Sequence, residues 1–360
     1  MVFQAQAVVK MKKALVTGGN GFIGSHLADL LLDKGYEVNI FVRKGFVHEA
    51  YHDIQDPRID SHLQERGAKF FHGDLLDKES LKPALEGVTH VFHVAGIAYP
   101  YHGLPNYIYH TVNVLGTMNL YELCKGRKIK RFVYVSSIEA AGPSPDGRPL
   151  TEKSSRNPTD AYGRSKRDAE LWLLANYKND KIPVTIVRPP MTYGERSPLL
   201  ERLFKYVKKG MFPMFGKGDA SFEFCYVKNL VHGMYLAGEK EKSIGNIYFI
   251  SEGSYKVIDV VNEIAKVMDV KLKVIHIPRS IAYCIGFVME ILNKLLPFYP
   301  FRGKQTGSPI FSRKSVDWIT NDRYICSIDK IKKELGYKPV YSREEGIRNT
   351  VKWYEEEGWI

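Results

Sequence analysis

ALVTGGNGFIGSHLADLLL, residues 14–32, is the stretch that decides the fold. Residues 14–17 are apolar or β-branched, as in a strand that is buried on both faces. A glycine-rich turn follows, and residues 25–34 then carry the apolar spacing of an amphipathic helix, which Gly35 ends. The stretch therefore predicts a strand, a glycine turn and a helix in direct succession.

The spacing of the glycines matches a loop that holds a dinucleotide. Gly18 stands where the turn needs backbone angles that a β-carbon disfavours, and Gly21 allows the backbone to approach a pyrophosphate. Gly24 allows the helix to pack close to the strand. The phosphates would lie on N–H groups at the helix start, so Phe22 and Ile23 join the three glycines in the predicted cofactor site. A purely structural turn is the weaker alternative.

Strand and helix patterns continue to alternate along the first half, which is typical of a parallel sheet with crossover helices. We expect a helix over residues 162–177 and strands over residues 14–17, 38–42, 69–72, 90–94, 131–135 and 184–188. The sequence predicts an α/β fold, a Rossmann-type doubly wound parallel sheet at residues 11–189. Residues 190–360, where the alternation is lost, are expected to form a smaller substrate-binding part, with segments 226–238 and 246–250 returning to the sheet.

The ends of the predicted strands supply the other candidate cofactor contacts. Arg43 follows the second strand, where NAD-binding proteins usually carry an acid, and its guanidinium suits the 2′-phosphate of NADP. This favours NADP(H); if Arg43 is only a surface residue, NAD(H) is the alternative. Asp74, beside Leu75, can bond the adenine amino group. Ala95 leaves room for the cofactor ribose, and Pro189, after the last of these strands, completes the set.

A second motif, Tyr162-Gly-Arg-Ser-Lys166, places a tyrosine and a lysine on one face of the predicted helix. A tyrosine with an ordinary pKa of about 10 is a poor acid or base at neutral pH. We expect the Lys166 ammonium to lower the pKa of Tyr162 and to bond the cofactor ribose as well. Ser137 ends the motif Tyr-Val-Ser-Ser after a predicted strand, where its hydroxyl can bond a substrate oxygen while Tyr162 exchanges a proton.

In their order along the chain, the glycine turn, the segment ending at Ser137 and the Tyr162/Lys166 pair resemble the motifs of the extended short-chain dehydrogenase/reductase family, within the NAD-dependent epimerase/dehydratase superfamily. The resemblance extends from residue 14 to the C-terminal residues GIRNTVKWYEEEGWI. It implies an NAD(P)-dependent oxidoreductase in which Tyr162 is the acid/base, Lys166 its activator and Ser137 the orienting hydroxyl. Asn113, in Thr-Val-Asn-Val-Leu-Gly-Thr, falls where the family often places an active-site asparagine.

Segments 136–143, 225–237 and 281–296 are similar to those of 3β-hydroxysteroid and sterol-4α-carboxylate 3-dehydrogenases. Dihydroflavonol-reductase-like enzymes are close neighbours, and they use an arginine like Arg43. This branch implies that the enzyme interconverts a secondary alcohol and a ketone on an apolar, steroid-, terpenoid- or lipid-like substrate.

Nucleotide-sugar epimerases and dehydratases are the main alternative within the family. They commonly carry an arginine for the sugar-nucleotide phosphate where this chain has Phe222. The acid pair of the dehydratases is also incomplete, because Ile138 replaces an aspartate and only Glu139 remains. Lys217 or Lys228 could compensate for the missing arginine. A non-catalytic NADP-binding regulator is a third alternative, which the intact catalytic motifs disfavour.

The composition sets broader limits. Lysine and arginine exceed the acids by 12 in 360 residues, so anionic partners are expected, but no motif for nucleic acid accompanies the basic clusters. The cysteines lie far apart and predict neither a metal site nor a disulfide framework; buried free thiols are expected at Cys124, Cys225, Cys284 and Cys326. The partner predicted is a small-molecule substrate, and a homodimer remains an open alternative.

The segment at residues 279–304 has apolar residues at helical spacing, and it is too short to span a bilayer. Its first interpretation is a helix packed on the substrate-binding part. The second is a flap that rests on an anionic membrane through Arg279, Lys294, Arg302 and Lys304. With no signal peptide recognisable at the N-terminus, we expect a cytoplasmic protein that is peripheral to a membrane in the second interpretation.

Overall fold

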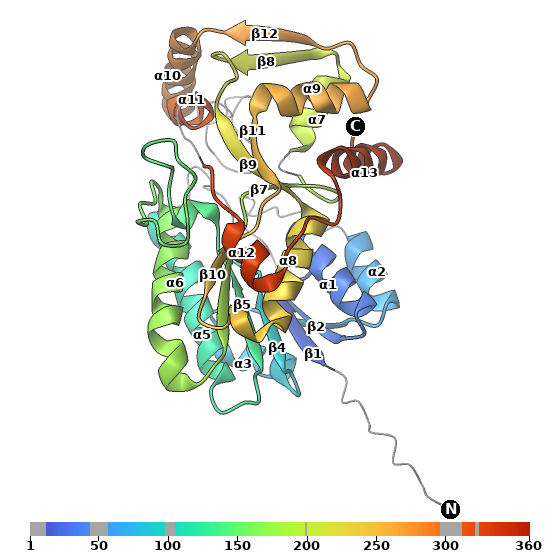
Figure 1. The fold of residues 1–360 in the computed structure, drawn as a ribbon, viewed down its shortest axis with the longest axis vertical. Helices are drawn as coiled ribbons and strands as arrows, with labels where there is room; N and C mark the ends of the chain where they lie inside the picture. Colours follow the sequence, from blue (N-terminus) through green and yellow to red (C-terminus); the bar gives the residue numbers. More distant parts are fainter. Residues whose placement is uncertain (1–11, 44–56, 98–104, 199, 296–311, 321–323) are drawn as a thin grey trace, which may run out of the picture.

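A parallel sheet of seven strands forms the centre of the protein (Figure 1), in the order β10-β6-β5-β4-β1-β2-β3. The computed structural model describes residues 12–43, 57–97, 105–198, 200–295, 312–320 and 324–360. Strand order reverses at β1, which lies between β2 and β4, and every neighbouring pair in this sheet runs parallel. The Rossmann-type doubly wound fold expected from the sequence is confirmed.

The central sheet consists of β1 (Lys13–Thr17), β2 (Glu37–Arg43), β3 (Lys69–Gly73), β4 (His90–His93), β5 (Arg131–Val135), β6 (Val184–Arg188) and β10 (Ile247–Phe249). The helices of this part are α1 (Phe22–Asp33), α2 (Pro57–Glu65), α3 (Lys78–Leu81), η2 (Pro83–Leu85), α4 (Asn106–His110), η3 (Thr111–Leu115), α5 (Gly116–Cys124), η4 (Ile138–Ala140), α6 (Ala161–Asp180), α8 (Val227–Glu239) and η5 (Glu241–Ser243). Helix α1 begins three residues earlier than its apolar spacing suggested, because Gly21 is its N-cap.

Apolar side chains cover both faces of the sheet. On one face they come from α1, α2 and α8, including Leu27, Leu63 and Met234. On the other they come from α3, α5 and α6, including Leu120 and Leu173. Burial on both faces explains why the strand sequences are nearly continuous runs of apolar residues.

The second half of the chain contributes to this sheet as well. Strand β10, inside the segment expected to return, pairs with β6 so that Ile247 lies opposite Ile186. Helix α8 packs against α1, β5 and β6, as Figure 1 shows. The sheet is therefore completed by residues from beyond position 190.

The remaining elements form a smaller part beyond the carboxyl ends of the strands (Figure 1). They are β7 (Met191–Tyr193), α7 (Glu201–Lys208), β8 (Met211–Phe215), β9 (Ser221–Tyr226), β11 (Gly253–Lys256), α9 (Val257–Val267), β12 (Lys273–Ile277), α10 (Arg279–Leu295), α11 (Arg313–Thr320) and α13 (Arg343–Glu356). Helix α12 (Asp329–Leu335) packs instead against β10 and η5 of the central part. Strands β11, β9 and β7 form one small sheet, and β12 pairs with β8.

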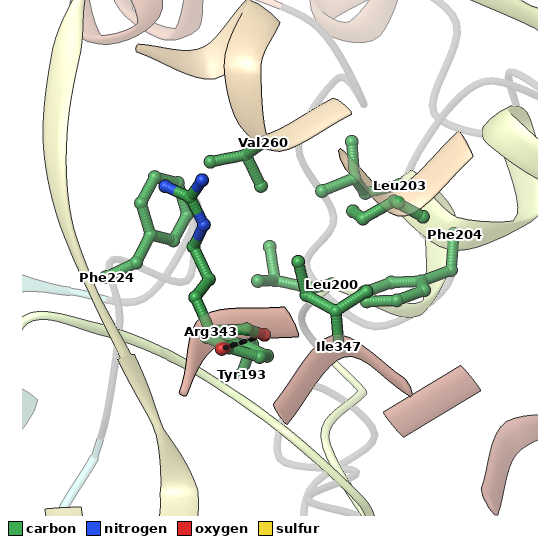
Figure 2. Close-up of a pocket in the computed structure, with 9 residues that line it drawn as sticks. Tyr193, Leu200, Leu203, Phe204, Phe224, Val260, Arg343 and Ile347 are labelled. Carbon is green, nitrogen blue, oxygen red and sulfur yellow. Dashed lines mark hydrogen bonds between the residues drawn. The ribbon is translucent and has the colours of Figure 1, made fainter. Parts of the chain in front are cut away.

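An apolar core joins α7, α9 and α13 (Figure 2). Phe204, Val260 and Ile347 point toward one another there, with the stem of Arg343 at the edge. The cavity between them is about 10 Å³. That volume is close to the least that one water molecule needs, so this space is a packing defect of the core and not a substrate pocket.

Helix α10 lies at the outer end of the molecule beside α11 (Figure 1). Its buried side meets the start of α11, where a β-carbon on Gly286 would come within 2.7 Å of the Arg313 nitrogen. Its other sides expose large apolar residues: Ile281 is 52% exposed, Val288 51% and Leu295 70%. Among the described helices none has the length and apolar character needed to cross a membrane.

Candidate active site

The glycine turn lies between β1 and α1, at the carboxyl edge of the sheet. Gly18 has a φ of 67°, in the region that side chains disfavour, and its N–H donates to the Phe41 carbonyl at 2.8 Å. A β-carbon on Gly24 would lie 2.1 Å from the Gly18 oxygen, so no larger residue fits this turn. Within the described chain no side chain caps α1 at Gly21. The turn thus has the form and the open helix N-terminus that a pyrophosphate requires.

The other candidate cofactor residues lie along the same edge. Arg43 ends β2 in register with Gly73, the residue before Asp74. The Asp74 side chain accepts the Leu76 N–H at 2.8 Å. Arg43 and Asp74, the residues expected to contact the adenosine end of the cofactor, therefore lie beside the glycine turn. Together with the turn they fit a dinucleotide.

Ala95 and Pro189 come from two further strand ends. The Ala95 N–H donates to Thr17 Oγ1 at 3.1 Å, which ties the end of β4 to the end of β1. The Pro189 carbonyl accepts the Ile138 N–H at 2.9 Å, next to Ser137. Leu75, which follows Asp74, is buried and lies against Gly116.

Ser137 and Tyr162 meet at the centre of the edge. Ser137 leaves β5 and caps η4, accepting the Glu139 N–H at 3.1 Å, while Tyr162 stands in the first turn of α6, which Asp160 caps. Both side chains are buried, and Ser137 lies near enough for its hydroxyl to lower the pKa of Tyr162 through hydrogen bonding. The structure therefore brings together two side chains that are 25 residues apart in the sequence.

The expectation of a lowered pKa for Tyr162 is wrong for the protein alone. Burial raises the pKa of Tyr162 above its usual value of 10, the hydrogen bond with Ser137 acts against burial, and the charge of Glu139 raises the pKa further. The neutral phenol is favoured because a buried phenolate loses its hydration. A positive charge brought into the site, such as an oxidised nicotinamide, would act in the opposite direction.

Lys166 lies one turn along α6 and is also buried. Its Nζ donates to the Val135 carbonyl at 2.9 Å and lies 5.0 Å from the centre of the Tyr134 ring. Burial lowers the pKa of Lys166 to about 8, and the charge of Glu170 opposes this shift. A lysine with this pKa is partly neutral near pH 8, so it can give up or take a proton more easily than an exposed lysine.

Asn113 lies close to Lys166, on the π-helical turn η3. A β-carbon on Gly96 would fall 2.7 Å from Asn113 Oδ1 and 3.3 Å from Lys166 Nζ, so both groups converge on that glycine. The Asn113 side chain accepts the Ile97 N–H at 2.7 Å and donates to Ser165 Oγ at 2.9 Å. Ser165 Oγ in turn donates to the Tyr162 carbonyl at 2.7 Å.

The buried ion pair between Glu170 and Arg188, next to Lys166 on α6, was not predicted from the sequence. Glu170, four residues after Lys166, receives Arg188 Nε at 2.8 Å and Nη2 at 2.6 Å, and Ser136 donates to it at 2.5 Å. Both charged side chains are fully buried. The spacing of Glu170 from Lys166 is visible in the sequence, but its partner on β6 becomes adjacent only because α6 packs on the sheet.

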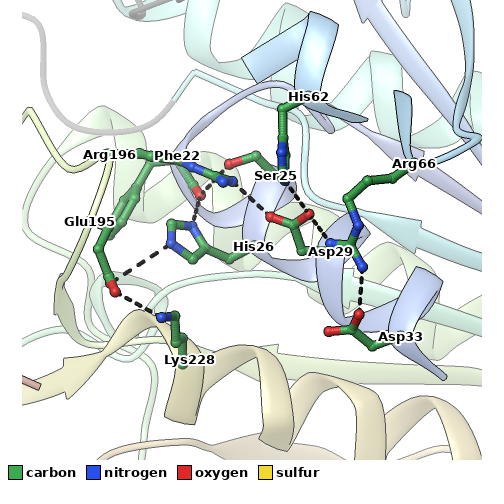
Figure 3. A network of polar contacts seen from close by, with 10 residues as sticks. All are labelled: Phe22, Ser25, His26, Asp29, Asp33, His62, Arg66, Glu195, Arg196 and Lys228. Atoms are coloured by element: carbon green, nitrogen blue, oxygen red, sulfur yellow. Dashed lines mark hydrogen bonds and ion pairs between the residues drawn. The ribbon is translucent and has the colours of Figure 1, made fainter. Parts of the chain in front are cut away.

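A second polar network joins the cofactor helix to the smaller part (Figure 3). Arg196, which follows β7 with a φ of 62°, donates to Asp29 of α1 at 3.0 Å. Its neighbour Glu195 accepts Lys228 Nζ at 2.8 Å and lies 3.9 Å from His26 Nε2. Burial lowers the pKa of His26 to about 4, so this histidine is neutral near pH 7. The network fixes the loop after β7 on the helix that carries the glycine turn.

The residues that bear on the nucleotide-sugar alternative are also placed. Phe222 is buried in β9, within the apolar core of the smaller part. Lys228 is held by Glu195, and Ile138 is buried. Of the two cations considered as substitutes for a phosphate-binding arginine, Lys228 is therefore already paired with a carboxylate.

Cysteines and metal ligands add no further site. Cys124, Cys225 and Cys326 are buried free thiols, whereas Cys284 is exposed on α10, contrary to expectation, because α10 leaves most of its surface uncovered. Among the described residues no cluster of histidine, cysteine, aspartate or glutamate could hold a metal ion.

Comparison with known proteins gives a consistent result. Residues 14–251 match the model of the NAD dependent epimerase/dehydratase family. The chain is 29% identical to the mouse (Mus musculus) sterol-4-alpha-carboxylate 3-dehydrogenase, decarboxylating, over 96% of this chain and 91% of the mouse protein. Two solved structures share its fold. The dTDP-glucose 4,6-dehydratase of Bacillus anthracis in complex with NAD has a TM-score of 0.74 and 23% identity, covering 97% of this chain and 98% of that chain. The UDP-glucuronic acid 4-epimerase of Bacillus cereus in complex with UDP-glucuronic acid and NAD has a TM-score of 0.74 and 22% identity, covering 96% of this chain and 99% of that chain.

Proposed function

Because this chain belongs to the NAD-dependent epimerase/dehydratase family and is an NAD-dependent oxidoreductase of the extended short-chain type, we propose that it interconverts a secondary alcohol and a ketone on an apolar substrate. The observation that carries the proposal is the burial of Ser137, Tyr162 and Lys166 together, with Ser137 just after the end of β5 and the other two one helical turn apart at the start of α6. The part before residue 190 binds the cofactor, and the part after it supplies most of the substrate pocket.

The chemistry assigns one task to each side chain. In the oxidative direction Tyr162 takes the hydroxyl proton of the substrate, and the carbinol hydrogen leaves as a hydride. When bound, the nicotinamide cofactor accepts this hydride, or supplies it in the reverse direction. Ser137 holds the substrate oxygen, and Lys166 offers a charge that favours the phenolate. Because burial favours the neutral phenol, oxidation depends on this added positive charge.

An apolar substrate is favoured over a nucleotide sugar. The buried Phe222 offers no charge to a diphosphate, and Lys228 is engaged by Glu195. The mouse relative, whose name is that of a sterol dehydrogenase, supports the same substrate class. Nucleotide-sugar epimerisation is the second candidate, and the two solved structures named above support it only through their shared fold.

A panel of substrates tests this proposal. With oxidised cofactor, 3β-hydroxysteroids and other apolar secondary alcohols should produce reduced cofactor, which is followed by its absorbance. UDP- and dTDP-hexoses should be neither epimerised nor dehydrated, which is followed by analysis of the sugar products because these reactions release no net reduced cofactor. If the nucleotide sugars are converted and no apolar alcohol is, the proposed substrate class is wrong.

For the cofactor we propose NADP(H) in preference to NAD(H), on the basis of Arg43. The family is NAD-dependent, and the two solved structures named above were determined in complex with NAD. Arg43 stands at the carboxyl end of β2, exposed, beside the strand that leads to Asp74. A guanidinium there matches a 2′-phosphate in charge and in the geometry of its donors.

We also propose that the protein is cytoplasmic and touches anionic membranes through α10. Its exposed apolar residues are unusual for a surface in contact with water, and the net charge of +12 favours an anionic lipid. Arg279 begins α10 and pairs with Asp317 of α11, and Arg313 begins α11 and pairs with Glu290 of α10. The side chain of Lys294 is not described, and Leu296, Arg302 and Lys304 lie outside the described residues.

Liposome flotation tests the membrane contact. The parent protein should float with anionic vesicles at low salt, bind less at high salt because surface charges are screened, and stay below neutral vesicles. Changing both Ile281 and Val288 to serine should abolish flotation, whereas Leu171→Ser, which alters an equally exposed leucine on α6, should not. If the parent protein stays in the soluble fraction, or if both variants float like the parent, α10 is not a membrane contact.

A further inference from the structure

His93 is the last residue of β4 and is 1% exposed. Its Nδ1 lies 2.7 Å from Thr17 Oγ1, and its Nε2 lies 2.9 Å from Thr117 Oγ1. Thr17 ends β1 and directly precedes the glycine turn, while Thr117 stands in α5 one turn after Asn113. One buried side chain therefore connects the cofactor loop with the helix that carries the active-site asparagine.

The hydrogen positions in this chain follow from its donors and acceptors. Thr117 Oγ1 donates to the Asn113 carbonyl at 2.6 Å, so its only hydrogen is used there. It must accept from His93 Nε2–H, which leaves Nδ1 without a hydrogen. Thr17 then donates to Nδ1 and accepts the Ala95 N–H. The imidazole is neutral, in one tautomer; burial and the charge of Lys166 lower its pKa to about 3.

The Asn113 end of the chain holds an irregular piece of backbone. Residues Thr111–Leu115 form a π-helical turn, closed by a hydrogen bond from the Gly116 N–H to the Thr111 carbonyl. Such turns are rare and cost regular helix bonding, so they persist where neighbouring contacts hold them. Here Thr117 holds the Asn113 carbonyl, and the Asn113 side chain reaches Ser165, which is bonded to the Tyr162 carbonyl.

We propose that His93 is a positioning residue that sets Asn113, through Thr117, and the glycine turn, through Thr17, in one fixed relation. The inference rests on the proposed function only in its claim about turnover. Hydride transfer needs the substrate-binding side and the cofactor side aligned closely, because small displacements between reacting groups cost large factors in rate. His93 is the described side chain that bonds to both sides.

Two conservative variants separate the two contacts of His93. In His93→Gln the amide nitrogen replaces Nε2 and can keep the bond to Thr117. In His93→Asn the amide oxygen replaces Nδ1 and can keep the bond to Thr17. His93→Leu removes both, and His90→Leu is the matched control, since His90 is a buried histidine of the same strand whose neighbours are Tyr36 and Glu239.

Four measurements on the full-length protein are compared: thermal unfolding, cofactor affinity, amide hydrogen exchange of residues 106–120, and kcat with an apolar alcohol. His93→Asn should speed exchange in that segment and lower kcat about tenfold, the scale of one unpaired buried group, with cofactor affinity close to the parent's. In His93→Gln, kcat and the exchange rate of residues 106–120 should stay close to those of the parent, while cofactor affinity should fall a few-fold. His93→Leu should lose both properties.

The proposal is overturned if Asn and Gln variants behave alike, or if His93→Leu matches His90→Leu in exchange and cofactor affinity once their unfolding temperatures are compared. The exchange and affinity measurements need no substrate. A parent protein that oxidises no apolar alcohol would therefore contradict the proposed function and leave these two measurements to decide the role of His93.

Discussion

Replacing Tyr162 with phenylalanine is expected to lower kcat by about two to four orders of magnitude, the contribution of a general acid/base. The ring remains to fill the buried space beside Ile97 and Tyr109, so folding should be retained. Cofactor affinity should change little, because the glycine turn supplies the phosphate contacts. Steady-state turnover and a cofactor titration on the same preparation measure both effects.

Two variants serve as controls for this result. Ser137→Ala should lower kcat in the same direction but less, since it removes one hydrogen bond to the reacting oxygen. Tyr177→Phe removes a phenol near the other end of α6 and should leave kcat within about twofold. Turnover by Tyr162→Phe within a few-fold of the parent would show that another group moves the proton.

The pH dependence should follow from the same residue. Oxidation of an alcohol requires the phenolate, and burial raises the pKa of Tyr162. The oxidative rate should therefore increase as the pH rises toward about 8 and should stop increasing above it, where Lys166 loses the charge that favours the phenolate; ketone reduction should decrease over the same range. In Tyr162→Phe the residual oxidative rate should no longer increase with pH in this way.

Removal of the Arg43 side chain should have the second largest effect. The parent protein is expected to bind NADP(H) more tightly than NAD(H), and Arg43→Ala should remove most of the difference. One charge-assisted hydrogen-bonded contact is worth about 1.5–3 kcal/mol, which is on the order of tenfold to a hundredfold in affinity. Affinity for NAD(H) should stay nearly constant, because that cofactor lacks the 2′-phosphate. Titrating NADP(H) and NAD(H) into the parent protein and into Arg43→Ala measures this change in preference.

The control for charge alone is Arg148→Ala, since Arg148 is a highly exposed arginine in the loop after η4. It lowers the net charge equally and should leave the preference for NADP(H) intact. Equal affinity of the parent for the two cofactors would contradict the assignment of Arg43.

The sequence predicted the central sheet well because its strands are buried on both faces. Strands β5 and β6 begin and end at the predicted residues, since each is a short apolar run between polar or glycine-containing segments. The start of α1 was placed too late, because apolar spacing locates the buried face of a helix and not its N-cap at Gly21. The motifs located Tyr162 and Ser137 because their chemistry requires particular residue types at strand ends and on a helix face.

The supporting contacts around the site could not be predicted in the same way. His93 was visible in the sequence, directly before Val94 and Ala95, but its two threonine partners come from other elements, 76 and 24 residues away. The Arg196–Asp29 contact joins residues 167 positions apart. Such pairs have no local periodicity, so only the packed fold reveals them.

The fate of the carbinol hydrogen tests the central claim most directly. An apolar secondary alcohol that the enzyme oxidises, carrying deuterium on its carbinol carbon, is incubated with oxidised cofactor, and the released reduced cofactor is examined by mass spectrometry. The account predicts that the deuterium leaves the substrate, appears on the nicotinamide ring, and is released with the reduced cofactor in proportion to the ketone formed. Ketone formation without deuterium in the cofactor, or deuterium that returns to the substrate with inversion at the carbinol carbon and no net ketone, would contradict it.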